Sequence, residues 1–119
     1  MDMETHKVVV AAMGMVIFLV GMVINIQSDS ILRGLRKEGE SGYKIPHGGL
    51  YGWVTCPNYL GEVVEWWGFV CVAQTFAALW FGVWSTMFLG TRAWQTHVWY
   101  NQKFEDYPKE RKAFIPNIL

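Results

Sequence analysis

The sequence predicts an all-α, polytopic membrane protein with about three transmembrane helices, one single span and a helical hairpin, followed by an interfacial C-terminal helix. Hydrophobic residues make up 52% of the 119 residues, and seven residues are Trp. Two stretches, residues 8–28 and 63–90, carry almost no charge and are long enough to cross a bilayer. The formal net charge is zero, which argues against nucleic acid as a partner.

The first predicted span is the stretch 8–28, which contains no charged residue. Residues 8–24 are apolar or glycine throughout, long enough for a hydrocarbon core of roughly 30 Å. The run is too long for the apolar region of a signal peptide and has no small-residue cleavage pattern. We therefore expect a retained transmembrane helix, with a buried helix of a soluble protein as the alternative.

The polar end of this span forms a single helical stripe. It consists of Asn25, Asp29, Arg33 and Arg36, at positions i, i+4, i+8 and i+11. Arginine binds phosphates in bidentate geometry, and Asn and Asp can bond ribose hydroxyls or an amide, so the stripe suits a nucleotide. A solvated helix end with an ordinary pair between Asp29 and Arg33 explains the same spacing, and spacing alone favours that interpretation.

Residues 36–49 form a predicted loop, because they contain four glycines, one proline and dense charge. The loop has neither the glycine pattern of a Rossmann fold nor that of a P-loop. His47 has no triad partner or ligand cluster near it in the sequence, so we expect an ordinary loop residue. The two cysteines, Cys56 and Cys71, have no metal-ligand spacing, and we predict packing roles for them and no metal site.

A polar helix face precedes the second apolar stretch. Asn58, Glu62 and Glu65 share one side of a predicted helix. Carboxylates at the edge of an apolar segment are energetically costly and usually mark a site. We therefore predict a ligand at the start of this stretch.

The second apolar stretch, 63–90, is longer than one crossing requires, since a helix of this length would measure about 42 Å. A single tilted helix competes with a hairpin that turns near Gln74 and Thr75. A hairpin places nine of the ten Lys and Arg residues on one side of the membrane, whereas a single span divides them four against six. We predict the hairpin, and hence three crossings.

The tail begins as a predicted amphipathic helix. Its apolar and aromatic face consists of Ala93, His97, Tyr100, Phe104 and Tyr107. Trp94 and Trp99 are typical of the water–lipid interface. We predict that this helix extends into the headgroup region and ends at Pro108, before a basic segment suited to a membrane surface. His97 and Tyr100 point either to the loop or to the headgroups, and the pattern does not separate these alternatives.

Four segments resemble the C-terminal domain of the steroid 5α-reductases, the 3-oxo-5α-steroid 4-dehydrogenases of animals and their brassinosteroid-pathway relatives in plants. The segments are INIQSDSILRGLRK (24–37), GYKIPHGGLYGWVTCPNYLGEVVEWWGF (42–69), FLGTRAW (88–94) and WYNQKFEDYPKERKAFIP (99–116). The resemblance covers residues 13–119, so residues 1–12 are interpreted as a leader and the start of the first span.

This resemblance implies a multi-pass membrane enzyme of the endoplasmic reticulum that uses NADPH to saturate the 4,5 double bond of a 3-oxo-4-ene steroid. The matching cofactor positions are Asn25, Asp29, Arg36, Tyr43, Asn58, Glu62 and Tyr100. Arg33, Arg92 and His97 match positions with supporting roles. The resemblance therefore reverses the preference for a merely solvated stripe at the end of the first span.

The family mechanism implied by the resemblance is hydride transfer to the steroid C5, followed by protonation at C4. A donor must stabilise the charge that develops on the C3 oxygen. In the family, the Glu and Tyr that hold this carbonyl lie on earlier helices. We therefore expect this chain to form the C-terminal half of a larger helical bundle, with its catalytic residues on helices that the chain lacks.

Polar groups such as Asn25 and Glu62 would face lipid if partner helices were absent, which is costly. We therefore expect self-association or a companion N-terminal fragment, besides membrane lipid and a steroid substrate. Other interpretations are a very-long-chain trans-2-enoyl-CoA reductase, a polyprenal reductase and a non-catalytic module that binds NADPH. An isoprenylcysteine methyltransferase is a further alternative, but Arg33 and Arg36 argue against it because S-adenosylmethionine has no phosphate.

Overall fold

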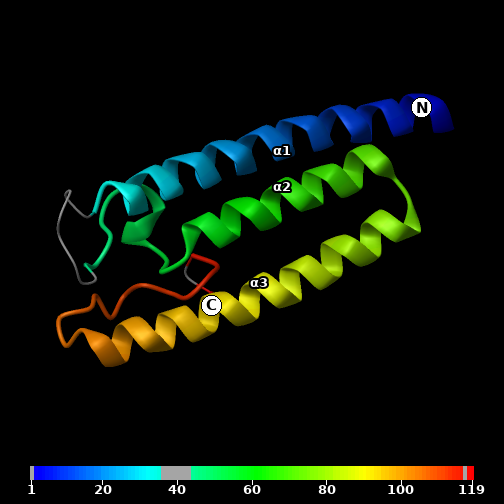
Figure 1. Cartoon of the computed structure of the whole chain (residues 1–119). Helices are drawn as coiled ribbons and strands as arrows, with labels where there is room; N and C mark the ends of the chain where they lie inside the picture. The colour runs from blue at the N-terminus through cyan, green and yellow to red at the C-terminus, as the bar shows by residue number, and fades with distance from the viewer. Residues whose placement is uncertain (1, 36–43, 117) are drawn as a thin grey trace.

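The computed structural model describes residues 2–35, 44–116 and 118–119 (Figure 1). Its elements are α1 (Met3–Arg33), the 3₁₀ helix η1 (Gly49–Gly52), α2 (Pro57–Ala73) and α3 (Phe76–Lys103). Within these ranges there is no strand, only an isolated parallel bridge between Val54 and Lys112. The all-α prediction is therefore confirmed.

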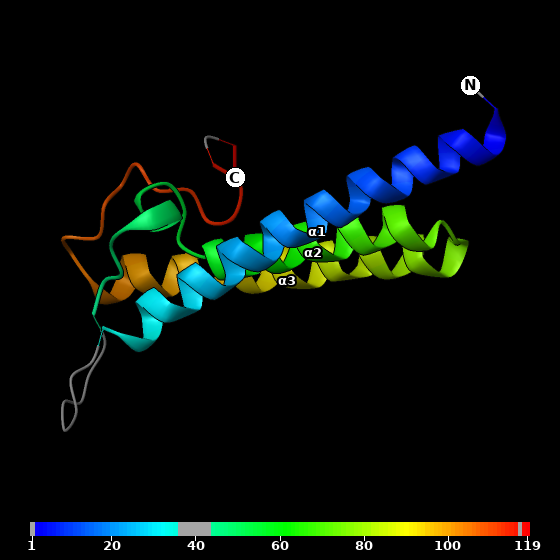
Figure 2. The same cartoon turned by 90° about the horizontal axis from the view of Figure 1, so that it is seen from above.

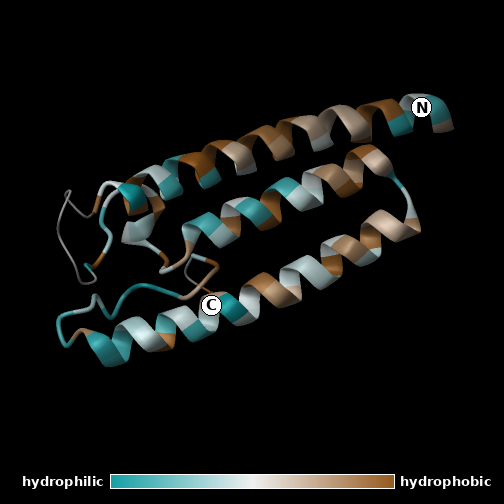
Figure 3. Cartoon of the chain, in the orientation of Figure 1, coloured by the Kyte–Doolittle hydropathy of each residue, from teal (hydrophilic) through white to brown (hydrophobic). Residues whose placement is uncertain are grey.

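The three helices run antiparallel in chain order, with α2 between α1 and α3 (Figure 1). Seen from above, α1 crosses α2 obliquely (Figure 2). The molecule is elongated, with extents of 56 × 25 × 22 Å. Hydrophobic colours run along α1 and the halves of α2 and α3 nearest their connection, whereas hydrophilic colours gather at the opposite end with the loops (Figure 3). We call this opposite end, with the end of α1, the start of α2 and the end of α3, the loop end.

Helix α1 contains the predicted first span. Asp2 caps its N-terminus by accepting a 2.7 Å hydrogen bond from the backbone N–H of Thr5. Among the described residues, α1 is the one helix long and apolar enough to cross a membrane, and most of it is exposed. Three crossings therefore remain a prediction.

Helices α1 and α2 pack through four glycines. Gly14 and Gly21 lie two turns apart on α1, and Gly61 and Gly68 lie two turns apart on α2. A Cβ atom on Gly21 would lie 2.6 Å from the Gly61 carbonyl oxygen, and one on Gly68 would lie 2.6 Å from the Gly14 carbonyl oxygen. The two backbones are therefore in contact without intervening side chains, as small residues permit in membrane helices.

A tight turn separates α2 from α3, at the position predicted for the hairpin. Gln74 ends α2 in a left-handed conformation with φ of 53°. Thr75 caps α3 by accepting a 3.1 Å hydrogen bond from the Ala78 N–H. Gln74 Nε2 also donates to the carbonyl oxygen of Lys7 at 2.8 Å, which ties the turn to the start of α1.

The chain after α3 differs from the prediction. Helix α3 ends at Lys103 rather than at Pro108, and no separate C-terminal helix occurs in residues 104–116 and 118–119. This segment, which we call the strap, turns back across the loop end (Figure 1). A continuous helix would separate residues 100 and 107 by about 10.5 Å. Tyr107, which is 1% exposed, instead stacks on Tyr100 with ring centroids 5.2 Å apart and bonds the Thr55 hydroxyl, which a helix continued to Pro108 would not allow.

The strap is held by backbone hydrogen bonds to the segment before α2. Lys112 N–H donates to the Trp53 carbonyl at 2.9 Å, and Thr55 N–H donates to the Lys112 carbonyl at 2.8 Å. At its end, the N–H groups of Ala113 and Phe114 both donate to the Leu119 carbonyl, at 2.7 and 2.9 Å. The buried core of this end consists of Cys56, Val63, Leu89, Ala93, Ala113 and Phe114.

Candidate functional site

The described part of the α1 stripe is accessible at the loop end. Asn25 is half-buried, while Asp29 and Arg33 are exposed. Among the described residues these last two form no ion pair, and Arg33 Nη2 donates to Ser30 Oγ at 3.4 Å instead. Both line a surface hollow of about 410 Å³ with Ile26 and Leu32. The ordinary Asp29–Arg33 pair is therefore not formed. Arg36 and Tyr43, two further predicted cofactor positions, lie outside the described residues.

Asn25 is joined to α2 by a hydrogen bond between side chains. Its Nδ2 donates to Glu65 Oε1 at 3.0 Å. The predicted polar face of α2 therefore meets the α1 stripe through Glu65. Asn58 and Glu62, on the same face, are half-buried and form no hydrogen bond with side chains or backbone of the described residues beyond their helix.

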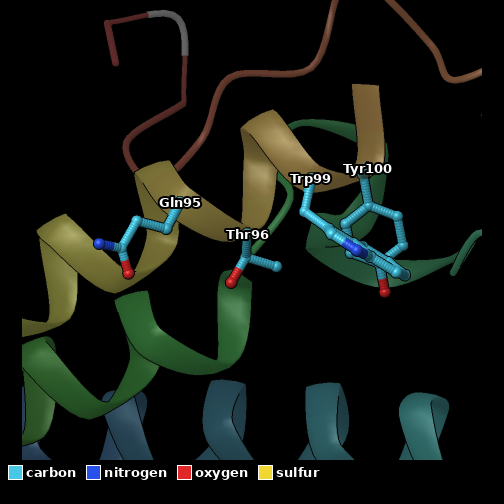
Figure 4. Close-up of a pocket in the computed structure, with 4 residues that line it drawn as sticks. All are labelled: Gln95, Thr96, Trp99 and Tyr100. Carbon is cyan, nitrogen blue, oxygen red and sulfur yellow. The ribbon is translucent and has the colours of Figure 1, made fainter. Parts of the chain in front are cut away.

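Tyr100 lies on α3 and lines a hollow at the loop end. Gln95, Thr96 and Trp99 complete this hollow of about 420 Å³ (Figure 4). In the close-up, the side chains of Thr96 and Tyr100 point from α3 toward the side where α2 and α1 lie. The Tyr100 ring also packs edge-on against Trp99, with centroids 5.1 Å apart.

A buried hydroxyl group connects His97 to the strap. The Thr55 Oγ1 atom lies 2.6 Å from His97 Nδ1 and 2.7 Å from the Tyr107 hydroxyl oxygen. Burial lowers the pKa of His97 below its ordinary value, and the positive charges of Lys112 and Lys109 lower it further. His97 therefore links α3, the segment before α2 and the strap.

Arg111 makes a second connection between the strap and the loop that precedes η1. It is 4% exposed, and its Nη2 donates to His47 Nδ1 at 3.1 Å. Its guanidinium carbon lies 5.2 Å from the centre of the Tyr107 ring, a cation–π contact. Nη1 is buried and finds no hydrogen-bond partner in the described ranges. His47 therefore lies in a loop, as the sequence predicts, and is in addition a hydrogen-bond partner of the strap.

Arg92 is exposed on α3, beside the hollow that contains Tyr100. Its guanidinium carbon lies 5.9 Å from the centre of the Tyr59 ring and 5.8 Å from that of Phe88. It also lines a neighbouring hollow of about 390 Å³. These contacts hold the guanidinium of Arg92 between two aromatic rings of α2 and α3.

The cysteines pack as predicted. Cys56 is buried, and burial raises the pKa of its thiol to about 12, against a smaller opposite effect of a hydrogen bond with Thr96. Cys71 is half-buried, and its Cβ lies against Gly14. Across residues 2–35, 44–116 and 118–119, no group of three His, Cys, Asp or Glu side chains is placed to hold a metal ion.

The sequence did not predict three features of this site. These are the hydrogen bonds of Thr55, the burial of Tyr107 and Arg111 in the strap, and the bond between Glu65 and Asn25. Their partners lie 40 to 64 residues away in the chain. No local spacing reports such contacts. The one available signal was that Glu65 is the single charge within residues 63–90.

Comparison with known proteins identifies the family. The family model described as 3-oxo-5-alpha-steroid 4-dehydrogenase matches residues 2–119. The chain is 52% identical over 118 residues to 3-oxo-5-alpha-steroid 4-dehydrogenase 1 of Rattus norvegicus, covering 99% of this chain and 45% of that protein.

Two other relatives give the same result. The chain is 50% identical over 108 residues to 3-oxo-5-alpha-steroid 4-dehydrogenase 2 of Homo sapiens, covering 91% of this chain and 42% of that protein. It is 47% identical over 106 residues to the Steroid 5-alpha-reductase DET2 of Gossypium hirsutum, covering 88% of this chain and 41% of that protein. The chain thus spans a little under half the length of these relatives. It belongs to the 3-oxo-5-alpha-steroid 4-dehydrogenase family, a family of oxidoreductases.

Proposed function

We propose that this chain forms the NADPH-binding half of a multi-pass membrane oxidoreductase of the endoplasmic reticulum. The enzyme reduces the 4,5 double bond of 3-oxo-4-ene steroids. The observation that carries the proposal is the hydrogen bond between Asn25 of α1 and Glu65 of α2, which joins the polar faces of these two helices. Tyr100 of α3 lines a hollow at the loop end. The printed names of the relatives, steroid dehydrogenases and a steroid 5-alpha-reductase, support the reaction class.

The described residues fit a dinucleotide. Arg33 is exposed and forms no ion pair with a carboxylate of residues 2–35 or 44–116, and its guanidinium suits a phosphate. Asp29 beside it can accept hydrogen bonds from ribose hydroxyls. Asn58, Glu62 and Tyr100 add hydrogen-bonding groups from α2 and α3, and we assign Arg36 and Tyr43 to the same ligand. NADPH supplies the hydride, and these residues bind and orient it.

The groups that polarise the steroid C3 carbonyl lie, in this proposal, on a segment that this chain does not contain. Much of the apolar surface of α1 is exposed, with Val16, Leu19, Val20, Val23 and Ile24 lining one hollow. A companion N-terminal segment or a second copy would cover such a surface. A second candidate is NADPH binding without turnover, favoured because the chain aligns with less than half of its relatives.

The test is binding of NADPH and NADH to the detergent-solubilised 119-residue chain, measured by isothermal titration calorimetry. We expect micromolar affinity for NADPH and weaker binding of NADH. A helical, thermally stable preparation that binds neither dinucleotide contradicts the proposal. Steroid reduction by the same preparation distinguishes the two candidates, because turnover excludes the non-catalytic module.

A further inference from the structure

The hydrogen bond between Asn25 and Glu65 fixes the direction of an amide at the site. A carboxylate oxygen only accepts hydrogen bonds, so the atom of Asn25 that faces Glu65 must be the donor, Nδ2. The amide is planar, and its oxygen is therefore turned away from Glu65. In the described ranges no group donates to this oxygen. Asn25 thus presents its carbonyl oxygen as an acceptor to a ligand, while one of the two N–H groups of Nδ2 is occupied by Glu65.

Glu65 is held in place by the glycine contacts of α1 and α2. A Cβ atom on Gly21 would lie 2.5 Å from the backbone nitrogen of Glu65, so the backbones meet at this point. One turn further along α1, the backbone nitrogen of Asn25 lies 2.7 Å from where a Cβ on Gly61 would be. The two side chains therefore face each other from backbones that have little freedom to move apart.

We infer that Glu65 is a positioning residue, which orients Asn25 so that its oxygen accepts a hydrogen bond from the carboxamide N–H₂ group of a nicotinamide ring. The inference rests on the proposed function and assigns one end of the ligand. Arg33 lies eight residues beyond Asn25, about 12 Å along the helix, and provides the charge for the phosphates. The nicotinamide end of the ligand, which carries no phosphate, then lies at Asn25, nearer the apolar part of α1.

The experiment compares two oxidised dinucleotides on the detergent-solubilised chain, NADP⁺ and its 3-acetylpyridine analogue. The analogue replaces the carboxamide N–H₂ group by a methyl group and keeps the charge and the carbonyl. We expect the wild-type chain to bind NADP⁺ about tenfold more tightly, as one buried hydrogen bond allows. Glu65→Met should reduce this ratio to about twofold or less, while the affinity for 2′,5′-ADP, which lacks the nicotinamide ring, stays unchanged.

The conservative variant is Glu65→Gln, whose carbonyl oxygen still accepts from Asn25, so the tenfold preference should return. Asn25→Asp places two carboxylates together and should abolish it. In Asn25→Asp combined with Glu65→Gln, the new amide at position 65 donates to the new carboxylate at position 25. An acceptor then still faces the ligand, so the preference should recover. This pair tests the inference even if Glu65→Met does not fold.

The possible failures are distinguishable. A folded wild-type chain that binds neither NADP⁺ nor 2′,5′-ADP overturns the proposed function itself. Binding of NADP⁺ without preference over the analogue, or a preference that survives in Glu65→Met, overturns the positioning role alone.

Discussion

Thr55 supports the loop end through a single hydroxyl group. The group has one proton and two lone pairs, so it can bond His97 and Tyr107 together, as the distances of 2.6 and 2.7 Å show. Tyr107 is almost completely buried, so water could not replace the Thr55 hydroxyl as its hydrogen-bond partner. Residue 55 therefore determines whether two other polar groups are satisfied.

Replacing this hydroxyl should destabilise the protein. Thr55→Val keeps the volume but leaves the Tyr107 hydroxyl and His97 Nδ1 unpaired, and we expect a loss of about 2–3 kcal/mol in the free energy of unfolding. Thr91→Val is the matched control, because its exposed hydroxyl bonds only the Met87 carbonyl within α3 and should cost less than about 0.5 kcal/mol. Denaturant unfolding in detergent, followed by circular dichroism, measures both. Equal losses would contradict the bridging role.

His97 should make the stability of the protein pH-dependent. Its pKa is lowered in the folded state, so the unfolded chain binds the proton first as the pH falls. The contribution of neutral His97 to the free energy of unfolding is fully present above the pKa of His in the unfolded chain, about 6.5. This contribution is lost as the pH falls from there to the lower pKa of the folded state.

We therefore expect the free energy of unfolding to be constant between pH 7.5 and 7 and to decrease by pH 5.5. His97→Gln should remove much of this decrease, whereas His6→Gln, at an exposed position of α1, should leave it intact. Unfolding curves at each pH provide the measurement, and an unchanged slope in His97→Gln would refute the assignment.

At the scale of elements, the contact of α1 with α2 depends on the absence of side chains. Gly61→Ala would place a Cβ atom 2.7 Å from the backbone nitrogen of Asn25 and 2.9 Å from the Gly21 carbonyl oxygen. Because both neighbours are backbone, the helices must separate, and we expect a loss of about 3 kcal/mol or more. Gly90→Ala, in α3, meets only Phe114 ring atoms at 3.7 Å and should be neutral or slightly stabilising, because Ala favours helix. Thermal unfolding in detergent compares the two.

The sequence predicted the three α-helices and their polar positions, because apolar runs and helical spacing are local properties, but not the short helix η1. It also placed the turn at Gln74 and Thr75, where the charge distribution favoured a hairpin. It did not predict the glycine contacts. Two glycines seven residues apart on one helix indicate a contact only when the position of the second helix is known. The early end of α3 was missed for the same reason: Tyr107 fitted the helical face, but its partner Thr55 lies 52 residues earlier.

The candidate site was predicted as a set of positions on three segments, and its internal contacts were not. Helical spacing put Glu65 on the face of Asn58 and Glu62, yet only the packing of α1 on α2 brings it to Asn25. Likewise, Arg111 belongs to the basic segment that the sequence predicts at the membrane surface. In the structure it is buried beside His47 instead.

At the scale of the whole molecule, the antiparallel order of the helices determines which segments share a side of the membrane. If all three helices cross, the turn at Gln74 lies opposite the loop end. A glycosylation acceptor inserted between Gln74 and Thr75 should then report the side opposite to one inserted between Lys109 and Glu110, two exposed strap residues. Modification of both in microsomes would contradict three crossings.

The hydrogen bonds at the end of the strap have a practical consequence for purifying this protein. Because the Leu119 carbonyl accepts hydrogen bonds from Ala113 and Phe114, the last residue helps to fold the segment that carries Lys112 and Arg111. An affinity tag or fluorescent fusion attached after Leu119 would therefore disturb hydrogen bonds within the strap. The opposite terminus begins at an exposed cap on α1, far from the loop end (Figure 1). An exposed loop position such as that between Lys109 and Glu110 leaves the Leu119 hydrogen bonds in place.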